Sequence, residues 1–208
     1  MTSIDFTSQY TGTRKRTFNR LISTALSLFK DGKLPSVSEV ASHADVSRAT
    51  AYRYFPTHSD LVSAIVSESL GPILTWLPDS QKTEERIQEL LLFAYPRMFQ
   101  YEGALRAALQ VSLQQWAAAR SSTVKVEKRL VRGHRKDILA MIVEPMKDDF
   151  SPEIIEKVKR SFSLIYGSEV FLVMKDIWNM DNAEVIKINQ WIATSLYNQA
   201  IKDNEKSQ

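Results

Sequence analysis

The sequence predicts an all-α protein, and three observations lead to that prediction. Apolar residues recur at spacings of three and four along most of the 208-residue chain, as on one face of a helix. Only six glycines and seven prolines occur, and no regular alternation of strands and turns is visible. A hydrophobic fraction of 44% supports a buried core, so we expect one large domain or two small ones.

The composition also excludes several classes of site. The chain has no cysteine, so disulfide scaffolds, thiolate zinc sites and cysteine nucleophiles are excluded. The three histidines, His43, His58 and His134, are scattered without the spacing of metal ligands. The chain contains no glycine-rich phosphate loop, HExxH pair or GxSxG elbow. We therefore expect no metal, no cofactor and no enzymatic activity.

Neither a targeting signal nor a membrane segment is apparent. The first 13 residues are polar and lack the apolar centre of a signal peptide. No apolar run approaches the ~18 residues that a membrane-spanning helix requires. We expect a soluble cytoplasmic protein with no membrane partner.

The first elements are an arm and a helix. Residues 1–12 read as a flexible arm, and residues 13–30 as an amphipathic helix that Asp31-Gly32 ends. Four basic residues open this helix, where they oppose the helix dipole. They are Arg14, Lys15, Arg16 and Arg20. Contact with DNA phosphates would compensate for that charge, and a solvated helix face is the alternative.

Two short helices follow, joined by a tight turn. Ser36 and Glu39 have the spacing of a capping box, which starts the first of them. Residues 44–46 are too few for anything but a turn, and Ser47 caps the second helix. Pro56 ends that helix, because proline lacks a backbone donor and clashes with the preceding turn. The spacing predicts a helix-turn-helix.

The same block resembles the signature of the TetR family of bacterial transcriptional regulators. The matching letters are Ser36-Val37-x-Glu39-Val40-Ala41, Ala44-x-Val46-Ser47, Ala49-Thr50-x-Tyr52-Arg53-Tyr54-Phe55 and Asp60-Leu61. The resemblance implies an N-terminal three-helix bundle over residues 13–70. It also implies a helical effector-binding and dimerisation domain over residues 71–202, before a tail at 203–208. The family often has lysine where this chain has His58, so a phosphate contact there would be weaker and pH-dependent.

The distribution of charge agrees with DNA binding. Residues 12–58 hold eight Lys or Arg against three Asp or Glu, whereas residues 59–208 hold 19 against 20. Positive charge is therefore concentrated on the segment with the helix-turn-helix. Arg48, next to the cap, suits the O6/N7 edge of guanine, and Ala49 suits a thymine methyl group. For Tyr54 the alternative is packing against the first helix. The predicted DNA contacts are Ser36, Ser38, Ser47, Arg48, Ala49, Thr50, Tyr52, Arg53, Tyr54 and His58.

The remaining elements are predicted as helices of varied length. One starts near Thr57 or Ser59 and is interrupted at Gly71-Pro72, where we place the domain boundary. Pro96 should kink or shorten the next one. The later helices are predicted at residues 84–101, 102–119, 123–143, 152–178 and 183–202.

The last two predicted helices carry apolar residues on more than one face, so a second copy of the chain should cover them. Gly167 and Ser168 would permit close approach of the two backbones. The core of a monomer is the alternative. The predicted interface residues are Phe162, Ile165, Val173, Ile188, Trp191 and Ile192.

The large apolar residues of the C-terminal part could line an effector pocket, and ordinary core is the alternative. The residues predicted to line the pocket are Trp76, Phe93, Phe99, Leu109, Trp116, His134, Phe162 and Tyr166.

These features predict a sequence-specific DNA-binding protein, and together with the resemblance they imply a homodimeric regulator. The resemblance further implies a repressor that a small molecule releases from a palindromic operator in double-stranded DNA. One alternative is a constitutive DNA-binding repressor with no effector. A more distant one is a helical enzyme or protein-interaction module with a vestigial helix-turn-helix.

Overall fold

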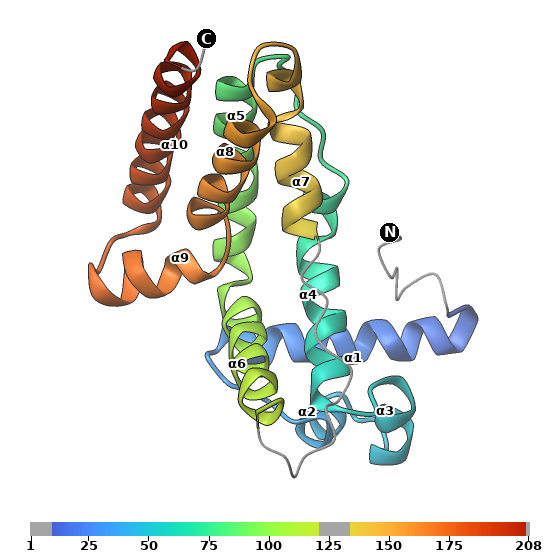
Figure 1. The fold of residues 1–208 in the computed structure, drawn as a ribbon. Helices are drawn as coiled ribbons and strands as arrows, with labels where there is room; N and C mark the ends of the chain where they lie inside the picture. Colours follow the sequence, from blue (N-terminus) through green and yellow to red (C-terminus); the bar gives the residue numbers. More distant parts are fainter. Residues whose placement is uncertain (1–9, 121–133, 207–208) are drawn as a thin grey trace. The chain divides into compact units, whose positions relative to one another are not determined.

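The computed structural model describes residues 10–120 and 134–206, and all regular secondary structure in these residues is helical. Figure 1 shows the order of the helices along the chain. The chain divides into two compact units. The first unit holds Met1–Gly71 and Gln100–Val131, and the second holds Pro72–Phe99 and Arg132–Gln208. Among the helices described, none has the length and apolar character needed to cross a membrane.

The first unit is built around one apolar core. Its helices are α1 (Gly12–Lys30), α2 (Val37–His43), α3 (Arg48–Tyr54), α4 (His58–Leu74, up to Gly71) and α6 (Glu102–Ala118). Side chains from all five helices meet in this core, including Leu21, Val40, Ala51, Leu61 and Ala107. Because α2 and α3 each bury one narrow face, their other faces are left to solvent.

A glycine brings α6 close to α1. A Cβ atom built on Gly103 would lie 2.1 Å from the carbonyl oxygen of Phe29. Only a residue without a side chain therefore fits between these two backbones. The segment predicted as a helix at 102–119 thus packs on α1 inside the first unit.

The second unit surrounds another core. Its helices are α5 (Thr83–Gln100), α7 (His134–Ile142), the short 3₁₀ turn η1 (Glu144–Asp148), α8 (Pro152–Ile165), α9 (Glu169–Phe171), the π-helical turn η2 (Leu172–Ile177) and α10 (Asn182–Glu205). Helix α8 packs against both α7 and α10. Tyr95, Phe162 and Phe171 are the largest aromatic side chains that are fully buried there.

Side chains from distant helices satisfy the end of α8. The Tyr95 hydroxyl donates to the carbonyl oxygen of Ile165 at 2.7 Å. Asn189 on α10 donates to the Tyr95 hydroxyl at 3.2 Å. Arg135 on α7 donates to the carbonyl oxygen of Ser163 and forms an ion pair with Glu169. The last carbonyl groups of a helix have no partner within it, so these bonds replace a local C-cap.

Two predictions about the helices need correction, and part of a third lies outside the described residues. The predicted interruption at Gly71-Pro72 is wrong, since α4 continues through Pro72 to Leu74; the proline lies in the last turn, where it removes only one helical hydrogen bond. The predicted helix over 152–178 is broken, because Gly167 adopts a φ of +157° between α8 and α9. Gly167 therefore ends a helix, whereas the sequence suggested close helix packing there. The predicted helix at 123–143 is described only from His134, because residues 123–133 lie outside the described part.

Candidate nucleic-acid interface

Helices α2 and α3 form a helix-turn-helix whose helix starts are capped locally. Glu39 donates its backbone N–H to the Ser36 hydroxyl, and Ser36 donates its own N–H to the Glu39 carboxylate, which completes the capping box. Ser47 caps α3 by accepting the N–H of Thr50. Asp45 adopts a φ of +51° in the turn, a conformation that aspartate tolerates better than most residues. The turn is held further by an ion pair between Asp45 and Arg20 of α1 at 3.6 Å.

Two predicted contacts use their hydroxyl protons inside the protein. Ser36 donates its hydroxyl proton to the Glu39 carboxylate at 2.7 Å, and Ser47 donates its own to the Thr50 hydroxyl at 2.8 Å. A serine has only one proton to donate. In this conformation both residues therefore serve as caps, while the Thr50 hydroxyl accepts a proton and keeps its own. The hydrogen bonds from Ser36 also lower the pKa of Glu39 below its ordinary value of 4.5.

The outer face of α3 presents the side chains that suit a DNA groove. Arg48, Ala49 and Arg53 are exposed, and Tyr52 is 44% exposed. The neighbouring Ala51 is fully buried, which fixes which side of α3 faces the core. The Tyr52 hydroxyl lies 3.2 Å from the hydroxyl of Ser38 on α2. Four predicted contacts therefore lie on the outer face of α3, and Ser38 joins them through Tyr52.

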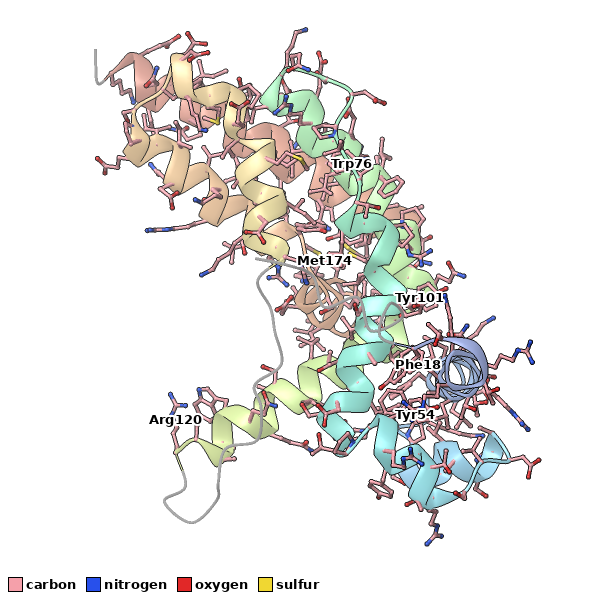
Figure 2. All side chains as sticks on the ribbon, turned by 90° about the vertical axis from the view of Figure 1, so that its right-hand side faces the viewer. Phe18, Tyr54, Trp76, Tyr101, Arg120 and Met174 are labelled. Atoms are coloured by element: carbon pink, nitrogen blue, oxygen red, sulfur yellow. The ribbon has the colours of Figure 1, made fainter. Side chains whose placement is uncertain are left out.

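Tyr54 belongs to the scaffold of the first unit. Its hydroxyl donates to the carbonyl oxygen of Arg14 at 3.1 Å, and its ring packs edge-on against Tyr10. Figure 2 shows Tyr54 beside Phe18, and their ring centroids lie 6.2 Å apart. The prediction of Tyr54 as a DNA contact is therefore replaced by its alternative, packing against the first helix. Nothing in the sequence singled out Tyr10, because its partners lie on two other segments.

His58 also differs from its predicted role. It is the first residue of α4, and its Nε2 atom is buried without a hydrogen-bond partner among the described residues. That nitrogen cannot reach a phosphate in this conformation. Thr57 and Asp60 cap the same helix start, because Asp60 donates its N–H to the Thr57 hydroxyl and accepts the Thr57 N–H.

The basic start of α1 lies on the surface. Arg14, Lys15 and Arg16 are exposed, and the first turn of α1 holds no acidic residue. Basic side chains at a helix N-terminus are unfavourable on their own. A polyanion bound there would relieve that repulsion.

The residues predicted for an effector pocket are divided between the two units. Leu109 and Trp116 belong to the first unit, and Trp116 is 58% exposed beneath the guanidinium of Arg120. In the second unit, Trp76 stacks on the exposed ring of Phe93, and His134 is half-buried at the start of α7.

The other three predicted pocket residues lie in the interior of the second unit. Phe99 packs against Tyr95 and Phe171. Phe162 and Tyr166 are buried, and burial raises the pKa of Tyr166 to about 12.

The residues predicted for the dimer interface divide by exposure. Phe162 and Ile165 are 0% and 4% exposed within a single chain, so they have no surface left for a second copy and are corrected to core. Ile188 and Ile192 are half-buried, whereas Val173 and Trp191 are 46% and 66% exposed. The sequence missed further exposed apolar residues on α8, η2 and the turn after it, namely Leu164, Leu172, Ile177 and Trp178.

The paired short helices, their local caps and the exposed face of α3 define a DNA-binding protein of the helix-turn-helix class. Residues 21–65 match the model of the bacterial regulatory proteins of the tetR family. Residues 21–65 are therefore similar to the helix-turn-helix domain of bacterial tetR-family regulators, and the chain carries a DNA-binding domain of that type.

Solved structures share this fold over most of the chain. A tetR-family transcriptional regulator from Streptomyces coelicolor is 22% identical with a TM-score of 0.68, over 94% of this chain and 86% of that one. A TetR transcriptional regulator from Rhodococcus sp. RHA1 is 16% identical with a TM-score of 0.58, over 89% of this chain and 97% of that one. No curated protein sequence gives a significant match.

Proposed function

We propose that the protein is a cytoplasmic, non-enzymatic repressor that inserts α3 into the major groove of a palindromic operator and leaves it when a small molecule binds. The observation that carries the proposal is the outer face of α3, where Arg48, Ala49, Tyr52 and Arg53 project from a helix that is capped and anchored on its inner side. Arginine reads guanine through two hydrogen bonds, and tyrosine contacts bases or phosphates.

DNA binding can be tested by fluorescence anisotropy with duplexes that the wild-type protein selects from a random pool. Arg48→Ala should weaken binding by about 1–3 kcal/mol, the usual contribution of a bidentate arginine. Lys136→Ala removes the same charge from an exposed position on α7 and should leave the affinity nearly unchanged. Equal losses for the two variants would mean that only net charge matters, and the proposed role of α3 would be rejected.

A two-fold dimer fits the exposed apolar side chains of the second unit. Leu164, Ile177, Trp178 and Trp191 are each 66–80% exposed in the single chain. Large apolar side chains that gather on the last helices favour burial against another surface. In a symmetric dimer the two α3 helices would read half-sites about one helical turn, ~34 Å, or more apart.

The oligomeric state can be tested with two substitutions of matched exposure. Ile177→Glu changes a residue that is 69% exposed in η2, and Leu113→Glu changes one that is 66% exposed on α6. Sedimentation velocity should show that Ile177→Glu shifts the protein towards monomer while Leu113→Glu does not. A wild-type protein that sediments as a monomer at micromolar concentration would contradict the proposed dimer.

The effector should bind in the second unit. The aromatic group of Tyr95, Phe99 and Phe171 supplies the large apolar surfaces that line most small-molecule sites. A ligand releases a regulator from DNA only by binding its non-binding conformation more tightly. Compounds that raise the melting temperature of the free protein should therefore lower its affinity for the selected duplex. If stabilising compounds never change DNA affinity, the protein is a constitutive regulator.

A further inference from the structure

The hydroxyl groups of Ser38 and Tyr52 form a side-chain hydrogen bond that links α2 to α3 on the outer face of the helix-turn-helix. Tyr52 follows the fully buried Ala51, and its ring is 44% exposed. A tyrosine at such a position can adopt several rotamers in solvent. The 3.2 Å separation from Ser38 shows that its ring leans across towards α2.

The chemistry of this pair distinguishes Ser38 from the other serines of the motif. Ser36 and Ser47 give their protons to partners three residues away, and both act as caps. Ser38 is half-buried in α2, and the cap of that helix is formed by Ser36 and Glu39 without it. Each hydroxyl has one proton and can accept two hydrogen bonds. Whichever of the two donates within the pair, the other keeps a proton to offer outward to a phosphate oxygen or a base acceptor.

We propose that Ser38 is a positioning residue for DNA recognition, which holds the Tyr52 ring in its reading orientation and so contributes to sequence selectivity. The inference rests on the proposed insertion of α3 into the groove. Ser38 acts through Tyr52, so its effect must depend on the tyrosine hydroxyl. Because no charge is involved, the pair should matter for specific binding and very little for electrostatic attraction to DNA in general.

A double-mutant cycle tests the dependence directly. The variants are Ser38→Ala, Tyr52→Phe and the double substitution, with Ser38→Thr as the conservative variant that keeps the hydroxyl. Two probes are used: a duplex that the wild-type protein selects from a random pool, and a scrambled duplex of the same length and base composition. Fluorescence anisotropy at fixed salt gives the dissociation constants, and circular dichroism gives the melting temperature of each variant.

Ser38→Ala should weaken binding to the selected duplex by about threefold to tenfold, the range expected for releasing one ordered side chain. It should leave binding to the scrambled duplex unchanged, and it should have no further effect in the Tyr52→Phe background. Ser38→Thr should bind within about twofold of wild type.

Two outcomes overturn the proposal. An equal loss from Ser38→Ala with and without the tyrosine hydroxyl would mean that Ser38 contacts DNA itself. No loss in the wild-type background would mean that the Ser38–Tyr52 bond has no part in recognition. A failure of the proposed function looks different, because Arg48→Ala would then also leave affinity for the selected duplex intact.

Discussion

The helix starts of the first unit and the ends of α7 and α8 in the second unit are secured by different means. In the first unit, three helix starts are capped by pairs only three residues apart: Ser36 with Glu39, Ser47 with Thr50, and Thr57 with Asp60. In the second unit, carbonyl groups at the ends of α7 and α8 receive their hydrogen bonds from α5. Arg86 donates to the Met141 carbonyl across 55 residues of sequence, and Tyr95 donates to the Ile165 carbonyl across 70.

This difference affects how each unit responds to a disturbance. A local cap forms within one turn of helix and does not depend on distant packing. A long-range cap exists only while two helices keep their positions, so its loss leaves a buried carbonyl without a partner. The helix-turn-helix of α2 and α3 should therefore keep its local geometry through changes that rearrange the second unit.

The largest expected effect comes from a contact in the first unit that is not local. Gly103→Ala would place a Cβ atom 2.1 Å from the Phe29 carbonyl oxygen, so α6 must move away from α1. We expect a loss of about 2–3 kcal/mol in the free energy of unfolding, measured in urea. Gly71→Ala is the control, because its Cβ would meet nothing within 4 Å and alanine favours the helix. Equal stability of the two variants would show that α6 does not depend on this contact.

The long-range caps come next in size. Tyr95→Phe removes the donor to Ile165 and leaves buried polar groups without partners, so we expect a loss of about 1–3 kcal/mol. Hydrogen exchange should rise at the end of α8 and stay unchanged in α2 and α3. Tyr197→Phe alters a half-buried tyrosine on α10 and should change stability by less than about 0.5 kcal/mol. Faster hydrogen exchange in α3 of the Tyr95 variant would show that the helix-turn-helix is not independent of the second unit.

A local cap should have a smaller effect, confined to its own helix. Ser47→Ala removes the acceptor for the Thr50 N–H, which costs about 1 kcal/mol at a typical N-cap. Exchange should increase in α3 alone. Ser42→Ala, at an exposed position of α2, should leave the exchange of both helices as in wild type. If the Ser47 variant also loosens α8, the caps of the two units are coupled.

The smallest expected effect is a change in the stability of the folded protein at acidic pH. The lowered pKa of Glu39 means that its carboxylate is stabilised in the folded protein. That contribution is fully present above the ordinary pKa of 4.5 and is lost as the pH falls through the lower, folded value. Glu39→Gln keeps a capping side chain but lacks the charge, so its melting temperature at pH 7 should lie slightly below that of wild type. Below pH 4.5 the variant should lose less stability than wild type, and parallel melting curves would show that Glu39 contributes nothing.

The difference between local and long-range hydrogen bonds also explains which features could be predicted from the sequence. The helix-turn-helix was predicted closely because Ser36, Ser47 and Pro56 signal their roles within a few residues. The break after α8 was missed, because the apolar pattern runs on through Gly167 and the bonds that hold the break come from Tyr95 and Arg135. Nothing local in the sequence reports such partners.

The DNA-contact set shows the same limit. The outer residues of α3 follow from its helical period, whereas the inward turn of Tyr54 depends on Arg14, forty residues earlier. One signal was available and not used: Asp181 and Glu184 have the spacing of a capping box and start α10.

The anchoring of Tyr10 has a practical consequence for handling the protein. Its ring is fixed against Phe18 and Tyr54, next to the helix proposed to enter the groove. Nine residues precede it, and so short a chain spans at most about 30 Å. An affinity tag fused to Met1 would therefore stay within reach of bound DNA and add its own charges to the measured affinity. Removing the tag by proteolysis before the measurement avoids that artefact.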